Sequence, residues 1–243
     1  MVDFTIRVAG RSAAVRAMYD TTRIFCKDYL WAGEADFALE VTGEDIAFER
    51  AENQRIGYND SDAYLEVIAL LRKTAQRLLE YDTLLFHGSV IAVDGAGYLF
   101  TAPSGTGKST HTRLWRQLLG RRVVTVNDDK PFLRITEEGV MAYGSPWCGK
   151  HGLNTSTSVP LKAVCILERG EENQIRPISP KAALATLFQQ SGRPQDAAQM
   201  SRYMELLDRL AGMVKFFHLC CNMTLEAAQV AYEAMACMSE NLK

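Results

Sequence analysis

Nine consecutive residues, Ala102 to Thr110, combine two glycines, a lysine and four hydroxyl side chains in the order Ala-Pro-Ser-Gly-Thr-Gly-Lys-Ser-Thr. The preceding stretch 97–101 is apolar enough for a buried strand, and 109–119 suits a helix. Glycines let successive backbone N–H groups converge on an anion, and a helix N-terminus adds unpaired donors. The pattern predicts a phosphate-binding loop, in which Lys108 reaches the outer phosphates and Ser109 meets Mg²⁺. An alternative is a glycine turn that only caps the helix.

The loop departs from the strict pattern G-x-x-x-x-G-K-[ST], because Ala102 stands where the first glycine belongs. This departure raises the question of which branch of phosphate-binding proteins the chain represents. The residues expected to bind nucleotide are Pro103, Ser104, Gly105, Thr106, Gly107, Lys108, Ser109 and Thr110.

Paired carboxylates form the second chemical feature. Asp128 and Asp129 follow an apolar strand at 121–126, about twenty residues after the lysine of the loop. Two adjacent carboxylates resist joint ionisation unless a cation lies between them. One is therefore expected to hold Mg²⁺, and the other to accept a proton from an attacking hydroxyl. The alternative is an ordinary Asn-Asp-Asp turn at the end of a strand.

Other cationic side chains are further candidates for the site. His87 lies on the strand that pairs with the strand of the loop, so it is either catalytic near a γ-phosphate or structural. Lys150 and His151 lie in a glycine-rich loop over 144–152, and the alternative there is a solvated surface loop with Trp147 beneath it. The two arginines that can touch substrate or phosphate are Arg176 and Arg193. His111 and His218 are interpreted as structural.

Hydrophobic periodicity predicts the elements that position these residues. The first ~60 residues suggest short strands, with a hairpin between 37–41 and 45–49, and a helix should follow to about residue 81. A strand over 84–93, the turn Asp94-Gly95 and the strand of the loop predict an antiparallel hairpin. That order differs from the βαβ units of common P-loop proteins. Further strands are expected at 132–135, 140–143, 161–168 and 214–221, and helices at 180–191, 195–212 and 224–240.

Composition favours a globular protein without a strongly charged partner. The 243 residues include 47% hydrophobic and 23% charged residues, and the net charge is −2. This charge gives no reason to expect nucleic acid or an anionic membrane as partner. No apolar run reaches the ~18 residues that cross a bilayer, and the start of the chain lacks the core of a signal peptide. We therefore expect a cytoplasmic location. The six cysteines form no C-x-x-C pair and are expected to be small buried hydrophobes.

Three short motifs resemble the superfamily of HPr serine kinase/phosphorylase and ATP-dependent phosphoenolpyruvate carboxykinase. The carboxykinase loop G-L-S-G-T-G-K-T-T is similar to 102–110, and its metal motif G-D-D-E-H is similar to 127–130. HPr kinase has a His-Gly strand, a hairpin and then its loop, which is the order of Phe86-His87-Gly88-Ser89, Asp94-Gly95 and the loop here. The second signature of HPr kinase after the Asp pair is absent. The chain is therefore similar to a stand-alone HPr kinase-like protein rather than to HPr kinase itself.

The resemblance implies an α/β fold with a mixed sheet: a phosphoenolpyruvate carboxykinase-like P-loop kinase core, a small N-terminal β-rich extension and C-terminal helices. Residues 1–80 would form the N-terminal β-rich region plus a helix, and 81–243 the nucleotide-binding kinase core. Lys108 and Ser109 would bind phosphate and Mg²⁺, Asp128 would be the base and Asp129 a metal ligand, with the reverse assignment open. His87 would occupy the position of the family's active-site histidine.

The function that these features favour is an ATP- and Mg²⁺-dependent kinase. Its acceptor would be a hydroxyl of a peptide, a protein or a small molecule, and the donor is open between ATP, ADP and pyrophosphate. A homo-oligomer is compatible with the sequence. The competing interpretations are a nucleotide-binding sensor that transfers nothing and a simple ATPase in which water replaces the acceptor.

Overall fold

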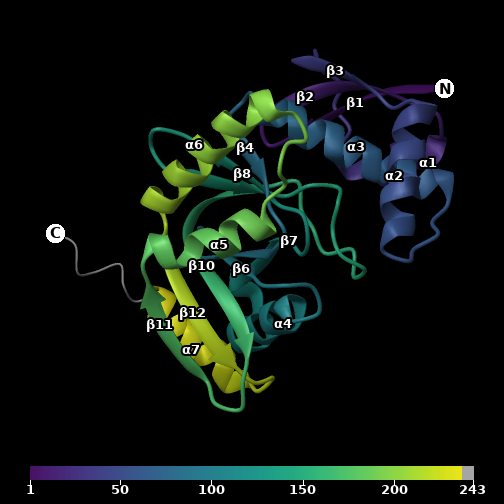
Figure 1. Cartoon of the computed structure of the whole chain (residues 1–243). Coiled ribbons are helices and arrows are strands. Elements are labelled where there is room, and N and C mark those ends of the chain that lie inside the picture. The colour runs from purple at the N-terminus through teal and green to yellow at the C-terminus, as the bar shows by residue number, and fades with distance from the viewer. Residues whose placement is uncertain (237–243) are drawn as a thin grey trace.

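The computed structural model of the chain describes residues 1–236, which form an α/β structure with one sheet of three strands and one of nine. In Figure 1 the small sheet and its helices lie at the N-terminal end, beside a larger curled sheet with helices on both faces. The small sheet has the order β1-β2-β3. Its strands are β1 (Val2–Val8), β2 (Arg11–Ala17) and β3 (Phe37–Glu40).

Helices interrupt the N-terminal strands where the sequence suggested only strands and turns. The helix α1 (Asp20–Phe25) and the 3₁₀ helix η1 (Lys27–Tyr29) precede β3, and α2 (Gly43–Arg55) follows it. The hairpin predicted between 37–41 and 45–49 is therefore wrong. Thr42 accepts the backbone N–H of Asp45, whose carboxylate accepts the N–H of Thr42 in return. This capping box starts a helix at the position that the alternating pattern assigned to a turn.

The helix α3 (Asp62–Leu79) joins the small sheet to the large one, as predicted for the stretch up to about residue 81. The Ser61 hydroxyl accepts the backbone N–H of Tyr64 and caps its start. Its buried face belongs to a hydrophobic cluster with the N-terminal strands. Phe132 and Trp147, which come from the region of the large sheet, belong to the same cluster.

The large sheet is mixed and branches at β10. Its main order is β4-β8-β9-β10-β6-β5-β7, while β12 pairs with both β10 and β11. The pairs β6–β10 and β10–β12 are parallel, and the other pairs are antiparallel. The strands are β4 (Thr83–Leu85), β5 (Ser89–Val93), β6 (Ala96–Thr101), β7 (Val123–Asn127), β8 (Phe132–Ile135), β9 (Val140–Tyr143), β10 (Ser158–Arg169), β11 (Gln174–Ile178) and β12 (Lys215–Cys221).

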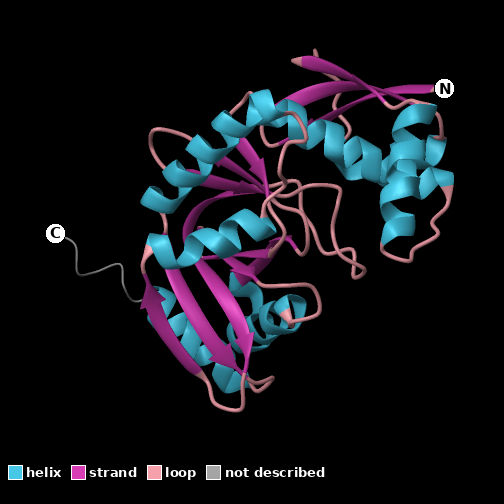
Figure 2. Cartoon of the chain, in the orientation of Figure 1, coloured by secondary structure: helices cyan, strands magenta, loops and turns pink. Residues whose placement is uncertain are grey.

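Two pairs of helices cover the faces of the large sheet (Figure 2). Apolar side chains of α5 (Pro180–Gln190) and α6 (Ala197–Met213) pack on one face, and those of α4 (Lys108–Leu119) and α7 (Leu225–Ala236) on the other. The 3₁₀ helix η2 (Gly120–Arg122) follows α4. The predicted helices are confirmed up to Ala236, and the end of the last one, 237–240, lies outside the described residues. The strand β11 was not predicted.

A β-hairpin delivers the glycine-rich loop, as the sequence predicted. The strands β5 and β6 are antiparallel, and the turn residues Asp94 and Gly95 have φ angles of 50° and 82°. The strand predicted over 84–93 is divided, because β4 pairs with β8 whereas β5 pairs with β6 and β7. At the break, a Cβ on Gly88 would lie 2.9 Å from the carbonyl oxygen of Phe100. Within residues 1–236, no helix has both the length and the apolarity that crossing a bilayer requires.

Candidate functional site

The glycine-rich loop lies between the end of β6 and the start of α4, in the predicted order of strand, loop and helix. Gly105 and Gly107 have φ angles of 78° and 119°, which side-chain-bearing residues rarely adopt. Thr106 donates its hydroxyl to the carbonyl of Pro103 at 2.9 Å, which closes the loop on itself. The first N–H groups of α4 have no partner within the helix, as at any helix N-terminus, and are available to an anion.

Lys108 projects from the first turn of α4 into the loop. Its ammonium donates to the carbonyl oxygens of Ala102 at 2.9 Å and Pro103 at 3.4 Å, and the residue is only 8% exposed. Burial lowers the pKa of this ammonium, and the carboxylate of Asp129 partly offsets the effect. A largely desolvated cation attracts a phosphate more strongly than a solvated one does.

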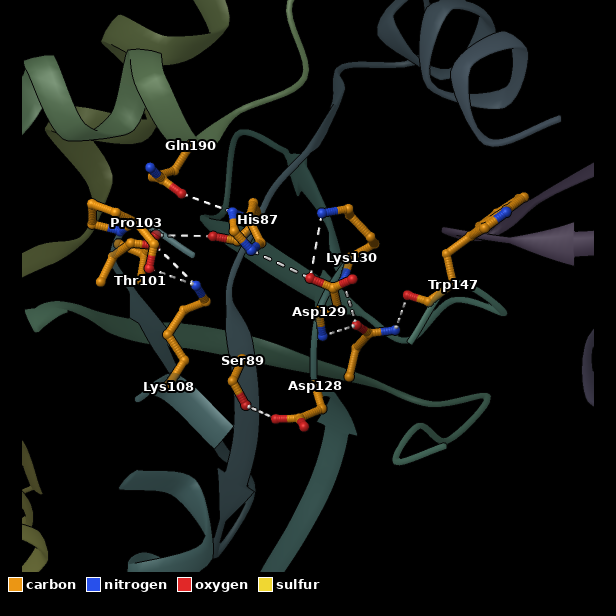
Figure 3. Close-up of polar contacts among 12 residues, drawn as sticks. His87, Ser89, Thr101, Pro103, Lys108, Asp128, Asp129, Lys130, Trp147 and Gln190 are labelled. Atoms are coloured by element: carbon orange, nitrogen blue, oxygen red, sulfur yellow. Dashed lines mark hydrogen bonds and ion pairs between the residues drawn. The ribbon is translucent and has the colours of Figure 1, made fainter. Parts of the chain in front are cut away.

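Asn127 organises the turn that carries the next two carboxylates. Figure 3 shows Asp128 directed toward Ser89 and Asp129 toward His87. Its side-chain N–H group donates to Ser145 and to the carbonyl of Trp147, while its Oδ1 accepts the backbone N–H groups of Asp129 and Lys130. The chain turns sharply at this point, so the neighbouring aspartates enter different surroundings.

Asp128 turns toward the first turns of α4. It is 3% exposed, and its Oδ1 accepts the hydroxyl of Ser89 at 2.6 Å. The hydroxyl of Ser89 also lies 3.3 Å from that of Thr112, which donates to the carbonyl of Ser109. The other oxygen, Oδ2, is buried without a hydrogen-bond partner among the described residues. An unpaired buried carboxylate oxygen is costly, and a bound cation would relieve that cost.

Asp129 turns the opposite way, toward His87. Its Oδ1 lies 3.4 Å from Nε2 of His87 and 3.3 Å from the ammonium of Lys130. The ring is fixed on its other side, where Nδ1 lies 2.9 Å from Oε1 of Gln190. Burial, together with the charges of Lys130 and Lys108, lowers the pKa of His87 to about 4. The imidazole is therefore neutral at neutral pH.

The loop over 144–152 passes directly beside the carboxylates. Trp147 is buried beneath it, and its indole N–H donates to the carbonyl of Val67 in α3 at 2.9 Å. A Cβ on Gly149 would lie 3.6 Å from Cβ of Asp129 and 3.9 Å from Oδ2 of Asp128. Lys150 and His151 follow as exposed residues in the adjacent turn. The structure thus brings this loop to the site, with the exposed side chains of Lys150 and His151 at the end of the loop.

The remaining residues that the sequence suggested lie at different distances from the glycine-rich loop and the two carboxylates. Arg193 follows a segment, 190–192, that runs antiparallel to 85–87, so it lies near the strand of His87. Arg176 is exposed on β11, opposite His218 and three strands from Thr101, or roughly 14 Å at the usual strand spacing. His111 is buried and accepts the indole N–H of Trp115 at 3.0 Å, as a structural histidine does.

Three residues of the site were not predicted from the sequence. Ser89 holds Asp128, Gln190 holds His87, and Arg169 donates from β10 to the carbonyls of Gly105 and Thr106 in the loop. Ser89 follows His87 and Gly88 in the predicted strand, but its residue type alone did not mark it as part of the site. Gln190 and Arg169 reach the site from distant segments, so only the fold brings them there.

A cavity of about 400 Å³ opens on the outer side of the glycine-rich loop. The loop and the first turns of α4 form one wall, and the ends of β10 and β12 form the other. Its lining includes Thr106, Thr110, His111, Arg169 and Asn222. No group of three or more His, Cys, Asp or Glu residues suited to a metal ion occurs within 1–236. A Mg²⁺ ion needs fewer protein ligands, because it is usually bound through one or two carboxylates together with substrate phosphates.

Comparison with known proteins gives a matching family and distant structural likenesses. A family model described as "SynChlorMet cassette protein ScmC" matches residues 57–228. The chain is also similar to the solved structure of the Hpr(Ser) kinase/phosphatase from Coxiella burnetii, with 14% identity and a TM-score of 0.37. That similarity covers 63% of this chain and 97% of the other. No curated protein matches the sequence.

Proposed function

The chain belongs to the family of the SynChlorMet cassette protein ScmC, and we propose that it is a Mg²⁺-dependent kinase that transfers a phosphoryl group from ATP to a hydroxyl. The observation that carries the proposal is the buried carboxylate of Asp128. One of its oxygens accepts the hydroxyl of Ser89 beside the first turns of the loop helix, and the other, Oδ2, has no hydrogen-bond partner among the described residues. Its surroundings suit a divalent cation at the position where a phosphate-binding loop presents its phosphates.

The donor nucleotide would bind along the glycine-rich loop. The backbone N–H groups of 105–109 and the ammonium of Lys108 would hold its phosphates, and the cavity of about 400 Å³ would receive the nucleoside. Arg169 fixes the loop from the side of that cavity through the carbonyls of Gly105 and Thr106. Support for a kinase core of the HPr kinase and phosphoenolpyruvate carboxykinase type comes from the motifs and from the hairpin that leads into the loop.

The metal would be held by Ser109 and Asp128, with Asp129 as a further candidate ligand. When bound, Mg²⁺ neutralises charge on the phosphates as the transferring group develops its transition state. The residues present fit this role, because the buried carboxylate of Asp128 has an oxygen without a hydrogen-bond partner among the described residues.

Transfer itself requires a base beside the acceptor. In the proposed step, the acceptor oxygen bonds to the γ-phosphorus, the bond from that phosphorus to the β–γ bridging oxygen breaks, and ADP leaves. The proton of the acceptor hydroxyl passes to a carboxylate. We assign this base to Asp129, which is more exposed than Asp128 and faces His87. The family resemblance implies Asp128 as the base and Asp129 on the metal, with the reverse open, and this arrangement supports the reverse, with Asp128 for the metal. In neutral His87 the proton would lie on Nδ1, which faces Oε1 of Gln190, so Nε2 would accept a hydrogen bond and orient the acceptor hydroxyl.

Transfer assays on three variants test the proposal. Purified protein is incubated with Mg²⁺ and γ-labelled ATP, with peptides and small hydroxyl compounds from a cell extract as acceptors. We expect a labelled product with the wild type and with Lys181→Ala, which removes an exposed lysine of α5. Lys108→Ala and Asp128→Asn should lower the transfer at least ~100-fold while leaving the circular dichroism spectrum unchanged.

Other outcomes would support a different function. Nucleotide binding without any labelled product would favour a sensor. Phosphate release at full rate without an acceptor would favour an ATPase. Near-normal transfer by either Lys108→Ala or Asp128→Asn would refute the mechanism.

A further inference from the structure

A second cavity, of about 170 Å³, lies between α3, β4 and the segment that follows α5. Its walls are mainly apolar, and cavities of about 150 Å³ with such walls can hold a benzene-sized group. The apolar residues that line it are Ile68, Leu71, Ala75, Leu79, Leu84 and Leu85. This cavity is separate from the one beside the glycine-rich loop, so the nucleotide proposed above does not need it.

The cavity is lined by residues that neighbour His87 and Gln190 along the chain. Leu85 lines the cavity and stands two residues before His87 along the chain. Two residues of extended chain span roughly 7 Å. The segment 190–192, which holds His87 through Gln190, continues directly into the cavity wall at Gly192 and Arg193.

One face of the helix α3 forms a wall of the cavity. Ile68, Leu71 and Ala75 follow each other at helical spacing and line it, together with Leu79.

The rim of the cavity carries a cation that no carboxylate of the described residues neutralises. The guanidinium of Arg193 stacks over the ring of Phe188 at 5.1 Å and forms no ion pair with any residue in 1–236. Arg72, the other arginine of the lining, is already paired with Asp45 and Glu49. An apolar cavity with one such cation at its rim suits an apolar side chain close to a carboxylate.

We propose that this cavity selects the acceptor, and that the acceptor is a peptide. The cavity receives an apolar side chain two positions from the serine or threonine that is phosphorylated, because the cavity lies about two extended residues from His87. A carboxylate of the same peptide pairs with Arg193. This inference rests on the proposed kinase function and names the substrate class of that site.

Synthetic peptides with a single serine test the inference. Leucine or asparagine is placed two positions before or after the serine, and the transfer from labelled ATP is measured as kcat/KM. Burial of a leucine side chain predicts that leucine at one of these positions raises kcat/KM about 10-fold or more over asparagine. Equal rates for all of the peptides would overturn the inference.

Variants of the cavity provide the second arm. Ala75→Leu fills the cavity and should reduce kcat/KM for the preferred leucine peptide about 10-fold while leaving the asparagine peptide and ATP binding unchanged. Ala51→Leu, on the exposed face of α2, is the matched control and should have no effect. Arg193→Gln should lower kcat/KM only for peptides that carry a carboxylate. An Ala75→Leu enzyme with wild-type preference would overturn the inference.

Failure of the acceptor inference can be told from failure of the kinase proposal. Transfer to small hydroxyl compounds but to no peptide would overturn the peptide acceptor and leave the kinase intact. Absence of both Mg²⁺-dependent ATP binding and transfer to any acceptor would overturn the kinase and, with it, the inference.

Discussion

Two adjacent carboxylates at the end of β7 have different surroundings because one side chain organises the turn between them. Asn127 accepts the N–H groups of Asp129 and Lys130, so the chain reverses immediately after Asp128. Asp128 then meets Ser89 and the loop helix, and Asp129 meets His87. In the proposed mechanism this separation lets one carboxylate bind a cation while the other accepts a proton.

Removal of the Ser89 hydroxyl should lower the apparent affinity for Mg²⁺. In Ser89→Ala, Asp128 loses the hydrogen bond that orients its Oδ1. Loss of a group that orients a metal ligand typically costs 10–100-fold in metal affinity. We expect the Mg²⁺ concentration for half-maximal transfer to rise about 10-fold, as measured by titration of initial rates. Thr22→Ala removes another buried hydroxyl, one bonded to Glu66, and should leave the titration unchanged. Equal titrations for both variants would argue against a metal at Asp128.

Some residues of the site belong to local sequence motifs, whereas others reach the site from distant parts of the chain. Lys108, Asp128 and His87 could be chosen from local patterns, since a glycine-rich turn, a strand end and a hairpin each have a sequence signature. Ser89, Gln190 and Arg169 carry no such signature. Gln190 reaches His87 across 103 residues of chain, and Arg169 reaches Thr106 across 63. Contacts of that kind depend on how α5 and β10 pack, which local patterns do not encode.

At the scale of elements, the glycine-rich loop depends on a backbone conformation rather than on a side chain. Gly107 caps α4 with a φ of 119°, and nothing lies within 4 Å of the place where its Cβ would be. Any effect of a substitution here is therefore one of backbone strain and not of crowding.

Gly107→Ala should disturb the loop and weaken nucleotide binding. Strain at such a position costs about 1–3 kcal/mol, which corresponds to about a 10-fold loss of affinity near the lower end. Isothermal titration with ATP and Mg²⁺ measures the loss. Gly43→Ala, at the start of α2 with open space around it and an ordinary φ, is the matched control. If both variants bound ATP as the wild type does, the loop conformation would not be what holds the nucleotide.

The helix α2 shows why the N-terminal elements were predicted incorrectly. The alternating residues 45–49 suggested a strand, but the capping box of Thr42 and Asp45 and the packing of α2 on α3 favour a helix. Asp45 also receives hydrogen bonds from Lys73 and Arg72 of α3. One carboxylate thus both starts α2 and joins it to the next helix, and the second role is visible only in three dimensions.

Acid should weaken this junction. Burial raises the pKa of Asp45, but the hydrogen bonds from Lys73, Thr42 and Arg72 outweigh it and lower the pKa from 3.8 to about 2. The folded state therefore gains stability above about pH 4 and loses that gain as the pH falls toward 2. Allowing for solvent screening, the gain is about 1 kcal/mol. Urea unfolding at pH 5 and pH 3 should show a smaller pH dependence in Asp45→Asn than in the wild type. Asp20→Asn, in an exposed ion pair with Arg23, should behave like the wild type.

At the scale of the whole molecule, the coarse fold follows from the sequence and the division into parts does not. Hydrophobic periodicity and turn signals predicted the hairpin before the loop and the C-terminal helices, and the family resemblance implied the mixed sheet. The boundary near residue 80 remains a prediction. A single hydrophobic cluster contains β1, β2, β3 and α3, and it also contains Phe132 of β8 and Trp147 of the loop beside the carboxylates.

This shared cluster predicts that the small sheet and the large sheet unfold together. Separation of the two would expose Phe132 and Trp147 and would break the hydrogen bond from the Trp147 indole to Val67. Hydrogen exchange at increasing urea concentrations tests this, since amides that open only with the whole molecule share one free energy of opening. The amides of β2 and β10 should reach the same value. Exchange of β2 at a markedly lower free energy would contradict the prediction and would make residues 1–80 a unit that opens independently, while the loop over 144–152 and the candidate site beside it stayed folded.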